Sequence, residues 1–126
     1  MSNLRFEVHD SGSVAQPYYW RIVGRNGYDV LARSETLVRK EHALEMARLL
    51  KTSARQLRFE VFRSNAGYQP WSWRVWADNN KILISASETY TSHSAANAAA
   101  ESVKGNAWSA EIVDKTRSAA SSSARW

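Results

Sequence analysis

The sequence predicts an α+β fold built from two tandem β-β-β-α-β repeats within one domain. A five-residue stretch, Leu4–Val8, recurs unchanged as Leu57–Val61, 53 positions further along the chain. In each copy the apolar residues first alternate, as they do in strands, and then adopt the spacing of an amphipathic helix. After the second helix an extended stretch over residues 108–114 closes the unit.

The repeat extends well beyond the first strand. Further matches at the same offset pair Gln16-Pro17 with Gln69-Pro70, Trp20-Arg21 with Trp73-Arg74, Ser34–Thr36 with Ser87–Thr89, and Lys51 with Lys104. One unit of roughly 50 residues buries too little apolar surface to be stable alone. We therefore expect the two copies, residues 4–53 and 54–114, to interlock in a single domain over residues 1–114.

Alternating apolar residues predict three strands in each copy. In copy one, Phe6 and Val8 belong to the first strand, and Trp20 and Ile22 share one face of the second. Asn26-Gly27 favours a two-residue hairpin turn, because both residues tolerate positive φ values. The remaining strand segments are Val30–Ala32 in copy one, and Phe59–Val61, Trp71–Val75 and Ile82–Ile84 in copy two, where Asp78–Asn80 is the weaker turn.

Helical spacing follows the third strand of each copy. The core-facing stripes are Ala43, Met46, Ala47 and Leu50 in copy one, and Ala96, Ala99, Ala100 and Val103 in copy two. These stripes predict helices over residues 39–51 and 92–104. The closing strand at 108–114 corresponds in copy one to residues 55–61, which also form the first strand of copy two. The join therefore has no linker.

These residues resemble the YegP-like small bacterial proteins. The resemblance covers residues 4–116 and is carried by Phe59-Glu60-Val61, Trp73-Arg74-Val75, Ser87–Tyr90, Asn106-Ala107 and Val113–Thr116. It implies one continuous antiparallel sheet with both helices on one face and C-terminal strands exchanged between the halves. It implies no activity. Copy one departs from the pattern at Leu37, where copy two has Tyr90, and both copies have a long first hairpin loop with Gln-Pro.

Composition narrows the classes of function. The 126 residues are 44% hydrophobic and 23% charged, as in ordinary globular domains, and the absence of cysteine excludes disulfides and thiolate metal sites. Neither a long apolar run nor a signal-peptide pattern is found. We expect a cytoplasmic protein with no membrane contact. A monomer is expected, because the duplication supplies the partner that a single unit needs.

The net charge of +5 raises the possibility of a nucleic-acid partner. Residues 1–53 hold eight Lys and Arg against six Asp and Glu, residues 54–114 hold six of each, and residues 115–126 hold three cations and no acid. Much of the excess therefore lies in the Ser/Ala-rich tail, 115–126, which we expect to be disordered. Its candidate contacts for an acidic or nucleic-acid partner are Lys115, Arg117, Arg125 and Trp126, and a loose terminus is the simpler alternative.

Polar residues also alternate along the strands and are expected on the sheet face away from the helices. The candidates there are Arg21, Arg58 and Arg74, interspersed with Arg5, Glu7 and Glu60, and Arg25 in the first hairpin turn. Cross-strand ion pairs explain this pattern better than a phosphate-binding face, which rarely contains carboxylates. Trp76 shares this face and is the best single contact candidate. Tyr18, Trp20, Trp71 and Trp73 are expected in the core.

No residue pattern reaches a catalytic motif. His9, His42 and His93 fall on separate elements, so we expect no metal site and no cofactor. Glu35 and Glu88 recur in both copies, but a favourable charge near a helix start explains them. The hypothesis is a non-enzymatic binding module that contacts a larger partner through its polar sheet face, hairpin loops and basic tail. The alternatives are nucleic-acid or ribonucleoprotein binding, a structural or accessory role in a larger assembly, and, least favoured, an enzyme.

Overall fold

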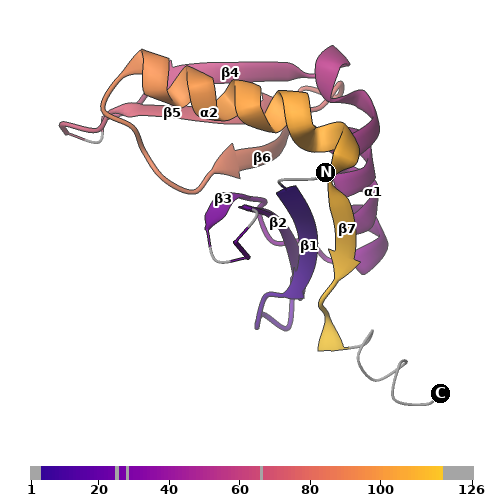
Figure 1. Cartoon of the computed structure of the whole chain (residues 1–126). Helices are drawn as coiled ribbons and strands as arrows, with labels where there is room; N and C mark the ends of the chain where they lie inside the picture. The colour runs from indigo at the N-terminus through magenta and orange to yellow at the C-terminus, as the bar shows by residue number, and fades with distance from the viewer. Residues whose placement is uncertain (1–3, 25, 28, 66, 118–126) are drawn as a thin grey trace.

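The computed structural model describes residues 4–24, 26–27, 29–65 and 67–117. The described chain folds into seven strands and two α-helices (Figure 1). Their bounds are β1 Leu4–Asp10, β2 Tyr18–Gly24, β3 Val30–Arg33, α1 Lys40–Ser53, β4 Arg58–Arg63, β5 Trp71–Trp76, β6 Ile82–Ala86, α2 His93–Asn106 and β7 Glu111–Asp114. A short 3₁₀ turn follows each helix, at Ala54–Gln56 and Ala107–Ser109.

All seven strands form one sheet in the order β4-β5-β6-β3-β2-β1-β7. The two halves meet at the centre, where Ala32 on β3 lies opposite Ala86 on β6. The α+β fold with one continuous sheet is therefore confirmed, but the sheet is mixed rather than antiparallel throughout. β7 runs parallel to β1, with Ile112 opposite Phe6, because a strand that returns after most of the chain can enter in either direction.

Both helices cover the same face of the sheet, and the core lies between. α1 packs on β1, β2 and β7, and α2 packs on β4 and β5. Trp20 and Trp73 are completely buried there, as expected. Tyr18 and Trp71 are only partly buried, because they lie at the first position of their strands. Among the residues the structure describes, no helix is both long and apolar enough to cross a membrane.

The two buried tryptophans differ in how their indole N–H groups are satisfied. Trp73 Nε1 donates to the hydroxyl of Tyr90 at 3.5 Å. Copy one has Leu37 in place of Tyr90, and each of these residues bridges to the start of its second strand. Within the described part of the chain, Trp20 Nε1 is buried without a hydrogen-bond partner. The Tyr-to-Leu difference between the copies thus leaves one buried donor unsatisfied.

The β2–β3 connection is longer than the two-residue turn expected from Asn26-Gly27. Gly24 N donates to Asp29 O at 2.8 Å, so four residues lie between them. Gly27 has a φ of +77°, the left-handed conformation that glycine adopts without strain. Asn80, with a φ of 63°, holds the equivalent place in copy two. The two turns lie at equivalent places, as expected, but the two-residue length expected in copy one is wrong, because Gly27 N donates to Gly24 O and thus ends the turn instead of forming its centre. In copy two Ala77 N donates to Lys81 O, so Asp78–Asn80 form the turn as expected.

The helices begin one residue and end two residues later than expected, and the 3₁₀ turns postpone the strands that follow. The strand expected over 55–61 begins at Arg58, and that expected over 108–114 begins at Glu111. The expected role of Glu35 and Glu88 is wrong, because both precede their helices by several residues. Ser92 caps α2 instead, accepting a hydrogen bond from Ala95 N at 3.0 Å.

The first residues of the expected disordered tail pack on the folded body. Lys115 N donates to Val8 O at 2.8 Å, and Arg117 N donates to Asp10 Oδ2 at 2.7 Å. Thr116 between them is 1% exposed. For these three residues the expectation of disorder is wrong, because the backbone bond from Lys115 extends the pairing of β7 and the bond from Arg117 N reaches the side chain of Asp10. Residues 118–126, with Arg125 and Trp126, lie outside the described residues.

Candidate functional site

The sheet face opposite the helices, which we call the open face, carries most of the ion pairs of the described chain. On this face the registers align one row of residues across six neighbouring strands. From β4 to β1 the row runs Glu60, Arg74, Ser85, Arg33, Arg21 and Glu7. A carboxylate therefore lies at each end, and three arginines lie between.

The Glu7 cluster forms one end of this row. Arg5 Nε lies 2.8 Å from Glu7 Oε2, and Arg21 Nη2 and His9 Nε2 lie 3.2 and 2.8 Å from Oε1. Burial would raise the pKa of Glu7, but hydrogen bonds with His9, Arg5 and Arg21 outweigh it and lower the pKa from 4.5 to about 2. Glu7 is 2% exposed. It was expected in an exposed cross-strand pair, but it is a buried anion that holds three side chains.

The Glu60 cluster forms the other end. Arg74 Nε and Trp76 Nε1 both donate to Glu60 Oε1, at 2.6 and 2.9 Å. These hydrogen bonds, from Trp76 and then Arg74, lower the pKa of Glu60. The guanidinium groups of Arg58 and Arg74 lie 4.7 and 5.1 Å from the centre of the Trp76 ring. Trp76 lies where the sequence predicted, but its N–H and its ring already have partners.

Arg33 lies between the two clusters, at the seam where β3 meets β6. It is exposed and stands opposite Ser85. Its guanidinium lies 4.9 Å from the centre of the Tyr19 ring, and within the described chain it pairs with no carboxylate. A hollow of about 460 Å³, the seam hollow, adjoins it and is lined by Val30, Arg33, Ser34, Glu35, Ser85, Ala86 and Ser87.

Sequence reasoning missed Arg33, because the repeat directs attention to residues that recur and this arginine does not. Its repeat-equivalent position is Ala86, and its cross-strand neighbour Ser85 is uncharged. The pairing register of β2 and β3 is the signal that could have identified Arg33. Arg21 lies opposite Arg33 on the neighbouring strand, so two adjacent cations share one face, and only Arg21 reaches a carboxylate.

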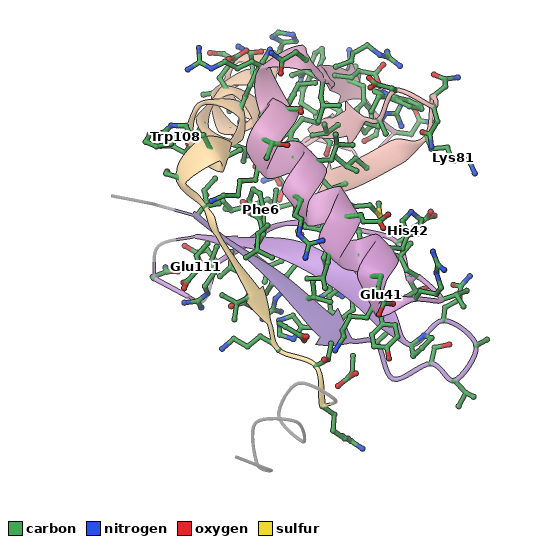
Figure 2. The ribbon with its side chains drawn as sticks, turned by 90° about the vertical axis from the view of Figure 1, so that its right-hand side faces the viewer. Phe6, Glu41, His42, Lys81, Trp108 and Glu111 are labelled. Atoms are coloured by element: carbon green, nitrogen blue, oxygen red, sulfur yellow. The ribbon has the colours of Figure 1, made fainter. Side chains whose placement is uncertain are left out.

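A second cleft, of about 240 Å³, lies between α1 and the β5–β6 turn. His42 and Glu45 of α1 and Lys81 of the turn line it, over apolar residues that include Met46 and Leu83. Figure 2 shows His42 on α1 and Lys81 at the tip of the β5–β6 hairpin. In the described ranges no group of three His, Asp or Glu side chains could hold a metal ion. The cleft combines charges of both signs, so it indicates no single ligand class.

The predicted contact residues separate into two sets. On the open face, Arg58, Arg74 and Trp76 come together around Glu60, whereas Arg21 lies in the Glu7 cluster at the other end of the row. Lys115 and Arg117 are exposed beyond the end of β7, at the edge of the sheet. The remaining candidates, Arg25, Arg125 and Trp126, fall outside the described residues.

Comparison with known proteins adds a family match over part of the chain and a fold over most of it. Residues 69–114 match the family described as a domain of unknown function, DUF1508. A protein of unknown function, yegP from E. coli, superposes with a TM-score of 0.77 at 21% sequence identity, over 93% of this chain and 97% of that one. The YegP-like resemblance is confirmed. A UPF0339 protein from Shewanella oneidensis gives a TM-score of 0.74 at 20% identity, over 90% and 92%.

The DUF1508 match falls within the second copy of the repeat, whereas the YegP-like fold extends over both copies. None of the curated proteins matches the chain. The names of the two similar structures state no ligand and no reaction. The open face and the edges of the YegP-like sheet are therefore the features that indicate a function.

Proposed function

We propose that the chain is a non-enzymatic binding module whose open face docks a larger partner that presents anionic groups. The observation that carries the proposal is the exposed guanidinium of Arg33, which has no carboxylate partner among the described residues. A guanidinium offers a planar fork of donors that matches a carboxylate or a phosphate. The Tyr19 ring lies beneath the guanidinium and orients it through a cation–π contact, which does not neutralise its positive charge.

The neighbours of Arg33 support an anionic partner. In the row, Arg21 lies next to Arg33 and Arg74 lies beyond Ser85. Each of these two arginines pairs with the carboxylate at its own end of the row, Glu7 or Glu60. The centre of the row therefore keeps the unbalanced positive charge. The seam hollow beside Arg33 adds the hydroxyl groups of Ser85 and Ser87, which donate or accept hydrogen bonds, and it also contains the carboxylate of Glu35.

The electrostatics of the open face favour binding over acid–base catalysis. A general base or acid at neutral pH needs a pKa near the working pH. The pKa of Glu7 is lowered to about 2, and that of Glu60 is lowered by its bonds with Trp76 and Arg74. These carboxylates stay charged at neutral pH and serve to hold arginines in place.

Nucleic acid is the second candidate partner, favoured by the three arginines of the row and the net charge of +5. Base stacking does not support it. The Trp76 ring lies beside Arg58 and Arg74, and the Tyr19 ring stacks on His9 with centroids 5.6 Å apart. A nucleic acid would thus be held mainly through its phosphates. The exposed Lys115 and Arg117, and the hairpin loops, would extend either kind of contact.

A retention experiment with two arginine variants tests the open face. Immobilised full-length chain, Arg33→Ala and Arg48→Ala are each exposed to host lysate with and without nuclease. Arg48 is the matched control, because it is an exposed arginine on α1 at the opposite side of the sheet. We expect the wild-type chain and Arg48→Ala to retain the same partner and Arg33→Ala to lose it. Equal retention by all three would refute the proposal.

Labelled single-stranded DNA and RNA then separate the two kinds of partner. Nucleic-acid binding predicts an affinity that falls steeply between low and moderate salt, and retention that nuclease abolishes. A protein partner predicts nuclease-resistant retention and no saturable binding of either oligonucleotide.

A further inference from the structure

The two halves of the sheet correspond strand for strand, except at their outer edges. β1, β2 and β3 correspond to β4, β5 and β6 around the central seam. β7 lies beside β1 (Figure 1). Within the described residues no strand lies beside β4, which ends the sheet. The position on β4 that corresponds to β7 is therefore vacant.

The apolar side chains of the two edge strands differ in burial, as expected when only β1 has a further strand beside it. Phe6 and Val8 on β1 are completely buried, whereas their equivalents on β4, Phe59 and Val61, are only partly buried. All four side chains face the helices and pack against the core. The apolar side of β4 is thus already formed but incompletely covered.

Three contacts, two from α1 and one from β1, hold the β7 segment in place and show what such a strand requires. Lys51 Nζ of α1 donates to the carbonyl of Ala110, just before β7. Val8 O accepts a hydrogen bond from Lys115 N at 2.8 Å, just after β7. Between these points, Lys40 Nζ at the start of α1 lies 3.0 Å from Asp114 Oδ2.

The β4 edge carries the equivalents of these three groups. Lys104 corresponds to Lys51, and its Nζ lies 5.6 Å from the centre of the Phe59 ring. Val61 corresponds to Val8, and because β4 pairs with β5 in the same register as β1 with β2, the Val61 carbonyl points outward. His93 corresponds to Lys40 and begins α2, with its ring against Trp71 at 5.2 Å.

We propose that the free edge of β4 is a docking site for an extended segment of another protein, which adds parallel to β4 as β7 adds to β1. Backbone hydrogen bonds to the outward groups of Phe59 and Val61 would hold the segment in register. An apolar side chain at the position of Ile112 would cover the helix side of the edge, as Ile112 does on β1.

The charges of the edge select an acidic segment. Arg58 and Arg63 are exposed at the two ends of β4. Lys104 on α2 adds a third positive charge, with its Nζ 5.6 Å from the centre of the Phe59 ring on β4. β7 itself reads Glu111-Ile112-Val113-Asp114, acidic at both ends and apolar between. A second copy pairing through its own β4 would instead bring further arginines to the same edge, which disfavours that occupant.

A peptide of residues 109–116 is the probe, because it carries the required pattern. It is added to isotopically labelled full-length chain and followed by amide chemical shifts. We expect saturable binding with shifts at Phe59, Val61 and Lys104, and unchanged signals at Phe6 and Val8. A peptide with lysine at both acidic positions should bind at least about 10-fold more weakly.

Two protein variants complete the test. Val61→Pro removes the outward N–H and blocks strand addition, while it leaves the hydrogen bonds to β5 in place. Lys104→Met serves if proline disturbs folding, and each variant should weaken peptide binding about 10-fold. Shifts at β1 instead of β4, equal binding of the lysine peptide or absence of saturable binding would each overturn the proposal. So would peptide-free dimerisation that Val61→Pro abolishes, since a second copy would then occupy the edge. This site shares Arg58 with the open face but does not involve Arg33, which carries the proposed function, so its failure leaves the proposed function standing.

Discussion

Glu7 and Glu60 occupy equivalent positions in the two copies, but the Glu7 side chain is 3% exposed and that of Glu60 is 31% exposed. The difference accompanies the surroundings of each group: Glu7 has three ion-pair partners and a neighbouring strand, β7, whereas Glu60 has one ion-pair partner and no described strand beside β4. The same carboxylate is therefore a buried anchor in one copy and a surface group in the other.

Removing the charge at these two positions should have unequal effects. Glu7→Gln leaves the guanidinium groups of Arg5 and Arg21 without their carboxylate, and we expect a loss of about 3 kcal/mol in the free energy of unfolding. Glu60→Gln should cost less than about 1 kcal/mol, because solvent screens the pair. Urea denaturation of both variants measures this. Equal losses would show that burial of Glu7 contributes nothing.

Stability should fall with acid over a defined range. The folded-state pKa of Glu7 is about 2, below its ordinary 4.5, so the unfolded chain takes up the proton first as the pH falls. The contribution of Glu7, about 3 kcal/mol, is complete above pH 4.5 and is lost as the pH falls toward 2. Urea midpoints of wild type and Glu7→Gln at pH 7, 4 and 3 should converge. A gap that stays constant over this range would contradict the assignment.

Trp76 and Trp73 are on the same strand but should respond differently to replacement by valine. Trp76→Val introduces the residue that copy one has at the equivalent position, Val23, and should cost less than about 1 kcal/mol despite the lost bond to Glu60. Trp73→Val leaves a cavity in the core and should cost about 3 kcal/mol or more. Thermal denaturation of both variants provides the comparison. A large loss of stability for Trp76→Val would show that the Trp76 ring contributes to the stability of the fold.

The alanine stripe of α2 should not accept larger residues. Ala100 is 2% exposed and lies against the sheet, so Ala100→Leu should destabilise the fold by about 1–3 kcal/mol. Ala98 is exposed on the same helix, and Ala98→Leu should leave the free energy of unfolding nearly unchanged. Urea denaturation distinguishes the two. Similar values for both would mean that α2 has room above the sheet.

Restoring a tyrosine to copy one should stabilise the protein. Leu37→Tyr places a hydroxyl where Tyr90 has one, within reach of the buried Trp20 N–H, and we expect a gain of about 1 kcal/mol. Leu37→Phe is the control, because it adds the ring without the acceptor. A tyrosine variant no more stable than the phenylalanine variant would show that Trp20 gains no bond.

The sequence predicts the repeat, the strands and the core, because each of these leaves a local pattern. Trp20 and Trp73 recur at the repeat offset and alternate with arginines, and both are completely buried. The pattern does not specify neighbours. The pattern shows that residues 111–114 are extended, but not that they run parallel to β1. The direction of pairing depends on where α2 ends relative to β1.

The missed features of the open face share one physical cause. Glu7 is buried on a strand whose outer edge pairs with β7, from the far end of the described chain. The position of Arg33 depends on the register across the seam between the halves. Both are contacts between distant parts of the chain, and alternation within a strand carries no information about them.

The pairing of β7 with β1 also sets the order in which the nascent chain becomes protected. β1 and β2 are adjacent in sequence and pair early. The other edge of β1 stays unpaired until residues 111–114 have left the ribosome. Until then, the growing polypeptide exposes open strand edges at both ends of its sheet, and such edges template aggregation. Of the described strands, the last to be synthesised is therefore the one that ends this exposure at β1. Premature termination before β7 would leave the product vulnerable even though both copies of the three-stranded unit and its helix were complete.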